Sequence, residues 1–388
     1  MGERVDYVVV GLGALGSAAA WQLARRGYSV VGLERFALGH DLGASHDTSR
    51  ILRHSYHTPA YVELTREAYA DWADLEDASG ETLVTTTGGL DLFPPDPAIV
   101  PGDYTASMDA VGISYEALDA AEVARRWPAF RLPEGTLALH QADAAIVPAA
   151  RGTATMQALA RRHGADLRAE CAVTGLADLG SAGVQVETAA GTVTARGVVV
   201  TADAWTNDVL GHLGVHVPLD VTWEQVTYFA PPEPARFAPG VLPLWIWMDD
   251  PSFYGFPTYG ETTVKAAQDC GGPPVDPEDR GEVRTDPEML GRLAAFMGDV
   301  LPGSGDPVRS KRCLYTLTPD RDFVLAPVPG HEHVVVGLGA AHGFKFAPTF
   351  GRLLADLVST GITATDLSAY RLDREALTDP AYVASWLV

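Results

Sequence analysis

Positively charged side chains recur in four short segments that also carry glycines, aromatic rings or a cysteine: 43–53, 253–266, 311–316 and 339–348. The first segment contains Ser45, His46 and Ser49, followed by Arg50 and Arg53. Two guanidinium groups three positions apart can bind a carboxylate or a phosphate in a bidentate manner. The alternative interpretation is a pair of solvated surface arginines. The segment is therefore a candidate anion site.

The second segment places a lysine in an apolar run, and the third places a cysteine after two cations. Lys265 lies downstream of Tyr254 in a strand-like region. A lysine in such a strand either extends its ammonium group to water or is positioned for use. Cys313 directly follows Lys311 and Arg312, and two adjacent cations would stabilise its thiolate and lower its pKa. The alternative is that Cys313 is a small, buried apolar residue.

The fourth segment, Gly339 to Pro348, combines glycines with His342 and Lys345 ahead of a helical pattern. Glycines and a cation that lead into a helix suit an anionic group, such as a substrate carboxylate. The pair His331 and His333 has the spacing of metal ligands, but it lies in a turn before a strand, and we expect no metal site.

These segments must be positioned by a fold, and the beginning of the chain indicates which one. An apolar run leads into Gly11, Gly13 and Gly16, and a helical pattern follows. The first glycine permits a sharp turn, the second lets the backbone approach a pyrophosphate, and the third lets the helix pack on the strand. The helix N-terminus, which begins with Ala14 and Leu15, offers free N–H groups to phosphates.

A second apolar run ends at Glu34, whose carboxylate can accept hydrogen bonds from both ribose hydroxyls. Arg35 follows directly and would usually suggest a 2′-phosphate, but a carboxylate at the ribose position argues against that interpretation. Strand, glycines, helix, strand and terminal acid together predict a dinucleotide site.

The pattern of apolar and polar residues changes twice along the chain. Helical patterns are expected at 60–77, 149–162, 204–213 and from about 347, and buried strands at 193–200 and 333–338. The region 219–266 instead contains short runs that largely alternate apolar and polar residues, as antiparallel strands do. A buried strand that returns near the end of the chain to close over the cofactor favours FAD over NAD.

We therefore predict an α/β fold, in which a Rossmann-like FAD-binding domain carries an inserted antiparallel-sheet substrate domain of α+β type. The FAD-binding domain would be discontinuous and take residues 1–85, 145–215 and 315–388. The substrate domain would take residues 86–144 and 216–314.

The composition limits the partners. With 388 residues, 47% hydrophobic and 20% charged, the chain is typical of a compact globular protein with two domains. Its formal charge of −22 argues against nucleic acid and anionic membranes as partners. The first strand leaves no room for a signal peptide after Met1, and we expect a cytoplasmic protein. The odd set Cys171, Cys270 and Cys313 indicates no disulfide framework.

In their order and separations, the motifs resemble the monomeric sarcosine oxidase and N-methyltryptophan oxidase family of FAD-dependent amine oxidases. The resemblance covers nearly the whole chain. It includes the glycine-rich start, Ser-His-x-x-x-Arg-x-x-Arg, Tyr-Gly-Phe-Pro with the lysine downstream, Cys-x-Tyr-Thr and His-Gly-Phe-Lys. It implies that FAD oxidises a secondary or N-methyl amino acid to an imine, which hydrolyses, while O2 is reduced to H2O2. It also implies a monomer.

The resemblance implies roles for individual residues. Arg53 and Lys345 would clamp the substrate carboxylate, while Tyr254 and Tyr315 would line the pocket. Lys265 would meet dioxygen at the flavin.

Other residues would hold the flavin. Cys313 would attach FAD covalently through its sulfur, and His46 and Arg50 would stabilise the anionic reduced flavin. The full cofactor-binding set expected from the motifs and the resemblance is Gly11, Gly13, Ala14, Leu15, Gly16, Glu34, Arg35, Ser45, Ser49, Arg50, Val173, Trp205, Cys313, Gly343, Phe344 and Lys345.

The pocket departs from the family pattern. Asp269 stands four residues after Lys265, where sarcosine oxidases carry a histidine, and a carboxylate there would favour a cationic amine or a basic side chain. The alternative is a solvated acid in a turn. A large ring at Trp245 would reshape the pocket, which His342 would also line. Asp203 replaces a glycine often seen in the family, which would alter a close flavin contact.

Three alternatives remain open. A cyclic imino acid oxidase, acting on compounds of the proline, pipecolate or piperideine type, would use the same carboxylate clamp. A flavin-dependent amine dehydrogenase would differ in its electron acceptor. A flavin-binding protein without enzymatic activity would hold a flavin that no amine reduces.

Overall fold

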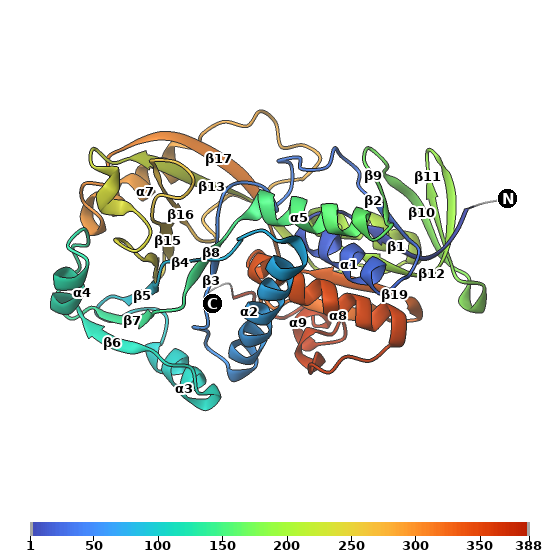
Figure 1. The fold of residues 1–388 in the computed structure, drawn as a ribbon, viewed down its shortest axis with the longest axis horizontal. Coiled ribbons are helices and arrows are strands. Elements are labelled where there is room, and N and C mark those ends of the chain that lie inside the picture. The colour runs from blue at the N-terminus through green and yellow to red at the C-terminus, as the bar shows by residue number, and fades with distance from the viewer. Residues whose placement is uncertain (1–2, 386–388) are drawn as a thin grey trace.

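The computed structural model describes residues 3–385, which form two lobes side by side, each built on one large sheet (Figure 1). The first sheet has the order β10-β11-β12-β1-β2-β9. In addition, β19 pairs with both β12 and β18. Its strands are β1 (Glu3–Val10), β2 (Val30–Leu33), β9 (Asp166–Arg168), β10 (Val173–Asp178), β11 (Val184–Thr188), β12 (Gly191–Val200), β18 (Val324–Val328) and β19 (His331–Leu338).

The centre of the first sheet is parallel, because β2, β1, β12 and β19 all run in the same direction. Their near-continuous valines are buried on both faces, as parallel strands require. One face packs against helices in the largest hydrophobic cluster. These helices are α1 (Ala14–Arg25), α2 (Pro59–Ser79), α5 (Ala149–Arg162) and α8 (Ala347–Thr360).

The second sheet has the order β17-β13-β16-β15-β14-β5-β7-β6. Its strands are β5 (Gly89–Phe93), β6 (Glu116–Asp119), β7 (Leu137–Gln141), β13 (Asp220–Ala230), β14 (Leu244–Trp247), β15 (Phe253–Phe256), β16 (Val264–Gln268) and β17 (Asp306–Leu317). Its pairings are antiparallel except that of β14 with β5, which is parallel. A small sheet of β3 (Arg50–Leu52), β8 (Ala145–Val147) and β4 (Thr85–Thr86) completes the strands.

Helices also cover the second sheet. Leu293 and Met297 of α7 (Pro287–Val300) and Val123 of α4 (Ala120–Arg126) belong to its hydrophobic cluster. The remaining helices are α3 (Pro101–Val111), α6 (Thr206–Leu210) and α9 (Glu375–Thr378). Within residues 3–385, no helix combines the length and the apolar character needed to cross a membrane.

The predicted α/β class with a Rossmann-like unit is confirmed. The helices expected at 60–77 and 149–162, and from about 347, are α2, α5 and α8. The helix expected at 204–213 is broken into short turns around α6. We keep the two domain ranges as a proposal; β17 continues to Leu317, past the proposed boundary at 314.

Candidate functional site

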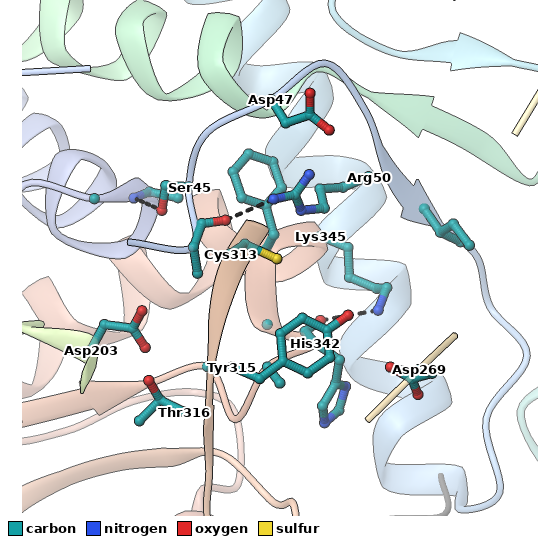
Figure 2. Close-up of a pocket in the computed structure, with 18 of the residues that line it drawn as sticks. Ser45, Asp47, Arg50, Asp203, Asp269, Cys313, Tyr315, Thr316, His342 and Lys345 are labelled. Atoms are coloured by element: carbon teal, nitrogen blue, oxygen red, sulfur yellow. Dashed lines mark hydrogen bonds between the residues drawn. The ribbon is translucent and has the colours of Figure 1, made fainter. Parts of the chain in front are cut away.

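A cavity lies where the carboxyl ends of the parallel strands face the second sheet (Figure 2). Parallel α/β sheets bind ligands at this edge. The first lobe contributes the turn at Gly13, Thr201 after β12, and residues from the end of β19 and the loop after it, between Gly337 and Lys345. A second cavity shares several lining residues with the first and continues it beneath the loop after β2. The shared residues are Gly13, Ala44, Ser45, His46, Thr201 and Asp203.

The glycines after β1 take the places that the sequence motif predicts. Gly11 has a φ of +86°, and a Cβ atom there would lie 2.5 Å from the carbonyl oxygen of Thr201. A Cβ atom on Gly16 would lie 1.9 Å from the carbonyl oxygen of Gly11, so the first turn of α1 packs directly on the loop. The amide of Ala14 donates to Ser45 Oγ at 2.9 Å. Only glycine therefore fits at positions 11 and 16.

Glu34 lies in the second cavity, as predicted for a ribose ligand. Its carboxylate accepts from the amides of Leu12 at 2.8 Å and Phe36 at 3.0 Å. Burial opposes its ionisation, but hydrogen bonds from His40 and these amides outweigh burial and lower the pKa of Glu34. The carboxylate is therefore charged and fixed in direction.

The other residues predicted for this region are brought together as well. Leu15 lines the first cavity, while Val173 and Trp205 line the second. Arg35 also lines the second cavity, but its guanidinium forms an ion pair with Glu278 at 2.6 Å, on the exposed surface. That pairing agrees with a site that does not select a 2′-phosphate.

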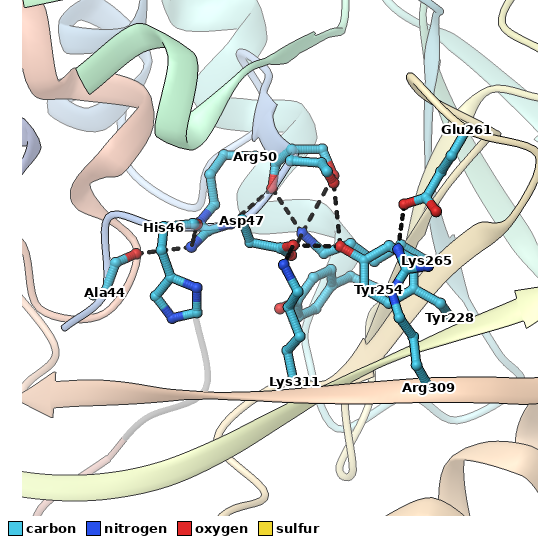
Figure 3. Close-up of polar contacts among 12 residues, drawn as sticks. Ala44, His46, Asp47, Arg50, Tyr228, Tyr254, Glu261, Lys265, Arg309 and Lys311 are labelled. Carbon is cyan, nitrogen blue, oxygen red and sulfur yellow. Dashed lines mark hydrogen bonds and ion pairs between the residues drawn. The ribbon is translucent and has the colours of Figure 1, made fainter. Parts of the chain in front are cut away.

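His46 lines both cavities, and Arg50, which lies near it (Figure 3), lines the first. Arg50 donates to the carbonyl oxygens of Ala44 at 2.7 Å, His46 at 3.0 Å and Ser49 at 2.9 Å. Burial and the charge of Arg50 lower the pKa of His46 to about 4, so its imidazole is neutral. Among the described residues, neither ring nitrogen of His46 has a hydrogen-bond partner.

Cys313 lines the first cavity from β17, but its predicted low pKa is wrong. Burial raises the pKa of Cys313 to about 11, although Arg50 opposes this rise. Successive side chains of a strand point to opposite faces. Arg312 accordingly donates to the carbonyl oxygens of Trp223 and Glu224, and Lys311 pairs with Asp47. Burial thus outweighs the cations around Cys313, and its thiol stays protonated.

Lys345 and Arg53 line the same cavity from distant segments of the chain. Lys345 follows β19, and its Nζ donates to Tyr56 Oη at 2.7 Å and to the carbonyl of His342 at 3.0 Å. Arg53 instead forms a buried ion pair with Asp91 of β5 at 2.8 Å. Among the described residues, no acid forms an ion pair with Lys345.

The electrostatics of this end of the cavity favour an anion. Burial and the charges of Arg53 and Arg321 lower the pKa of Lys345 well below its ordinary value. A bound carboxylate would restore its ammonium form, because an opposite charge favours the ionised state. His342 lines the cavity, and burial together with Arg321 and Lys345 lowers its pKa, so its imidazole is neutral.

Gly343 and Phe344 line the first cavity beside Lys345. Tyr254 and Tyr315 line the cavity from the same sheet, with their hydroxyl oxygens 3.4 Å apart. Asp203, with a φ of +49°, lies in the wall shared by both cavities. Burial raises its pKa to about 6, although the hydroxyl group of Thr316 opposes that rise.

Asp269 lines the cavity but is not an isolated carboxylate. Arg321 reaches it across 2.8 Å, and both side chains are largely buried. The expectation that Asp269 by itself selects a cationic substrate therefore needs correction, because Arg321 compensates its charge. Arg321 was not predicted, since the segment Asp320-Arg321-Asp322 has the composition of a surface turn.

The prediction that Trp245 shapes the pocket is wrong. Trp245 has no exposed surface and packs against Phe130 and Phe296 on the face of the second sheet covered by α7. Ile246, its neighbour in β14, lines the cavity instead. Both faces of this sheet are buried, so hydrophobicity does not reveal which residues of the strand point to the cavity.

Lys265 extends from β16 behind the cavity wall. Its Nζ lies 2.8 Å from Asp47, which lines the cavity, and donates to the carbonyl of Ser49 at 2.9 Å. Ser49 is thus a ligand of the lysine and does not line either cavity itself. The ammonium group also lies 5.0 Å from the centre of the Phe256 ring.

The residues present fit FAD. The two connected cavities place a glycine turn, a helix N-terminus and a charged acid at one end, as a dinucleotide requires. A Cβ atom on Gly13 would lie 3.1 Å from Ser45 Oγ, which leaves a narrow cradle for a phosphate. The two unpartnered nitrogens of His46 point to a polar ligand at the junction.

The fold and the site define a dinucleotide-dependent oxidoreductase. The chain belongs to the FAD dependent oxidoreductase family, whose model matches residues 6–357. It is 35% identical to a monomeric sarcosine oxidase of Streptomyces avermitilis, over 95% of this chain and 97% of the relative. It is 28% identical to an N-methyl-L-tryptophan oxidase of Citrobacter koseri, over 96% and 99% of the two chains.

Solved structures agree with this assignment. The chain superposes on NikD, described as an unusual amino acid oxidase essential for nikkomycin biosynthesis, with a TM-score of 0.84 and 32% identity. The match covers 95% of this chain and 97% of NikD. The protein is therefore an FAD-dependent oxidoreductase.

Proposed function

We propose that the protein is a sarcosine oxidase-like oxidase of secondary and N-methyl amino acids. It would oxidise the N–CH bond to an imine that hydrolyses, while O2 is reduced to H2O2. The main support is Lys345, a buried lysine without a carboxylate partner among the described residues, in the cavity that Cys313 also lines. The activities named for the relatives support the same class.

The charges of the site explain how an amino acid would bind. Arg53 is compensated by Asp91 and Arg321 by Asp269, so Lys345 is the group whose ammonium form a substrate carboxylate would stabilise. Arg53 lies close enough to favour the same anion. A buried charge-assisted contact of this kind fixes orientation as well as affinity.

The remaining side chains would prepare the bound substrate for oxidation. Tyr254 and Tyr315 would exclude water from its N–CH bond. Neutral His342 would hold Tyr56, which contacts Lys345, through the hydrogen bond that joins Nδ1 and the hydroxyl at 3.3 Å. FAD, when bound, supplies the acceptor for the two electrons of the N–CH bond. The protein thus contributes positioning and charge.

The residues that would hold FAD follow from the two cavities. Glu34 would bind the ribose, and the Gly13 turn with the N-terminus of α1 would bind the pyrophosphate. His46 and Arg50 would stabilise negative charge on the flavin. Cys313, whose side chain lines the cavity beside Tyr315, would form a thioether with it in place of its S–H bond and one flavin C–H bond, and the two electrons released would pass through the flavin to O2.

We expect Cys313→Ala to abolish covalent attachment of the flavin. After acid precipitation, the yellow colour of the wild-type protein should stay with the polypeptide, whereas the variant should release it into the supernatant. Cys270→Ala is the matched control, since Cys270 does not line either cavity, and its colour should stay bound. Free flavin from the wild-type protein would refute the linkage.

A cyclic imino acid is the second candidate substrate class. The paired charges of Asp269 and Arg321, together with the rings of Tyr254 and Tyr315, would suit a compact ring that carries one carboxylate. A peroxide assay under air with sarcosine, N-methyltryptophan, proline and pipecolate separates the two classes. Flavin reduction without peroxide would indicate a dehydrogenase, and no reduction by any of the amino acids would exclude this function.

The wider context stays a prediction. The relatives include proteins named as monomeric, which supports a monomer. We also retain a cytoplasmic location and dioxygen as the second substrate as proposals.

A further inference from the structure

The chain contains only three lysines, Lys265, Lys311 and Lys345, beside twenty-five arginines. All three lie at the main cavity: Lys345 lines it, and the other two contact Asp47, which lines it. Lysine differs from arginine in that its pKa can shift far enough for the side chain to lose its proton. Two of the three lysines, Lys265 and Lys311, contact the same carboxylate, that of Asp47.

Asp47 is the centre of this group (Figure 3). Its carboxylate lies 2.8 Å from Lys265 Nζ and 3.1 Å from Lys311 Nζ, and it accepts a hydrogen bond from Tyr228 Oη at 2.5 Å. The Asp47 side chain is 2% exposed and that of Lys265 is 4% exposed, whereas that of Lys311 is 44% exposed. One buried carboxylate thus forms ion pairs with one buried and one half-exposed lysine.

Strand pairing explains why these side chains converge. In β13, Tyr228 lies opposite Lys265 of β16, and Val226 lies opposite Lys311 of β17. Positions 226 and 228 share a face of the strand, so both lysines and the tyrosine point to the same side of the sheet. The sheet therefore builds a receptor for a carboxylate.

The loop before β3 holds the Asp47 carboxylate in place through a fixed backbone conformation. Asp47 has a φ of +79°, a conformation that residues with a Cβ atom rarely adopt. The carbonyl of Asp47 accepts from the amide of Ala150 at 3.0 Å, and that of Thr48 accepts from the amide of Ala149 at 3.3 Å. These two bonds tie the loop to the start of α5, so the backbone is held although its conformation is strained.

We propose that Asp47 is the positioning residue that keeps Lys265 charged and fixed for the reduction of dioxygen, and that Lys311 competes with Lys265 for this carboxylate. The proposal rests on the proposed oxidase function. Asp47 does not touch substrate in this scheme; it acts through Lys265. A fixed ammonium group would stabilise the negative charge that develops on dioxygen as it is reduced.

The charges around Lys265 give the sign of the expected effects. Burial and the nearby Arg50 lower the pKa of Lys265 to about 8, while Asp47 opposes them. The other groups that face this pair are Cys313 and Lys311 of β17, Tyr228 of β13 and the neutral His46. Since the ammonium form is the active one, reoxidation should slow as the pH rises through this pKa.

Two substitutions should move this pKa in opposite directions. Asp47→Asn preserves shape but removes the attracting charge, and we expect the pKa of Lys265 to fall by about 1 to 3 units. Lys311→Met removes the competing cation, and the pKa of Lys265 should rise, by less because Lys311 is half exposed. A purely structural role for Asp47 would not produce shifts of opposite sign.

The three lysines allow a direct measurement. Lysine labelled with carbon-13 at Cε gives one NMR signal for each residue, and the pH titration of each signal reports its pKa without any turnover. Lys311→Met and a Lys265→Met variant assign the signals. Lys345, which makes no contact with Asp47, is the internal control.

In the Asn variant, the Lys265 signal should titrate at lower pH and that of Lys345 should stay unchanged. The pH at which flavin reoxidation falls to half should shift by the same amount in stopped-flow measurements. An unchanged Lys265 titration, or shifts of the same sign in Asp47→Asn and Lys311→Met, would overturn the proposal. If no amino acid reduces the flavin, the proposed function fails, while the NMR titration still tests the charge relation.

Discussion

Replacing Lys345 by methionine should lower kcat/KM for an amino acid substrate by about 10²- to 10³-fold, as expected for the loss of one buried partner of a carboxylate. Methionine fills a similar volume without charge, and the two nearby ion pairs, Arg53 with Asp91 and Arg321 with Asp269, stay intact. Steady-state kinetics with the best substrate of the peroxide screen would measure the loss.

The matched control for Lys345→Met is a change in the substrate. An N-methyl amine that lacks the carboxylate should react poorly with the wild-type protein and should lose little more with the variant, since the contact is already absent. An equal loss for both substrates would mean that Lys345 does not bind the carboxylate.

Replacing Lys265 by methionine should slow the reaction of the reduced enzyme with O2 by about 10²- to 10³-fold, the usual cost of removing one charge-stabilising group. Anaerobic reduction by the substrate should change far less, because Lys265 lies behind Asp47 and Phe256 and does not line the substrate cavity. Stopped-flow absorbance separates the two half-reactions.

Lys265→Arg is the control for this prediction, since it retains a positive charge that does not titrate in the accessible range. It should reoxidise faster than the methionine variant, and its rate should not fall above pH 8. Equal rates for the two variants would show that charge at this position is not what promotes the reaction with O2.

The nucleotide-binding unit was predictable from the sequence because its signals are local. Gly11 and Gly16 are required by a turn and a close backbone contact, and Glu34 ends a strand of four residues that are all buried. These constraints act within one βαβ unit. They need no knowledge of the rest of the fold.

The substrate end was only partly predictable because it depends on contacts between distant segments. Arg53 meets Asp91, and Arg321 meets Asp269, across long stretches of chain. Asp91 stands alone in the apolar strand Gly89–Phe93, which could have marked it as a buried partner for a cation. Nothing in the sequence around Arg321 distinguishes it from a surface residue.

Two errors have the same physical origin. Adjacent residues in a strand point to opposite faces, so the Arg312 guanidinium donates to backbone carbonyls of β13, and Trp245 points away from the cavity that its neighbour lines. Sequence proximity was a poor guide to contact in both cases. The cations that approach Cys313, Arg50 and Lys265, come from other strands.

Anaerobic titration of the purified protein tests the central claim most directly. With a secondary amino acid from the screen, we predict that the yellow flavin absorbance is lost, and that admission of air restores it with one H2O2 formed for each substrate oxidised. A protein that carries no flavin, or a flavin that no secondary amino acid bleaches, would contradict the account.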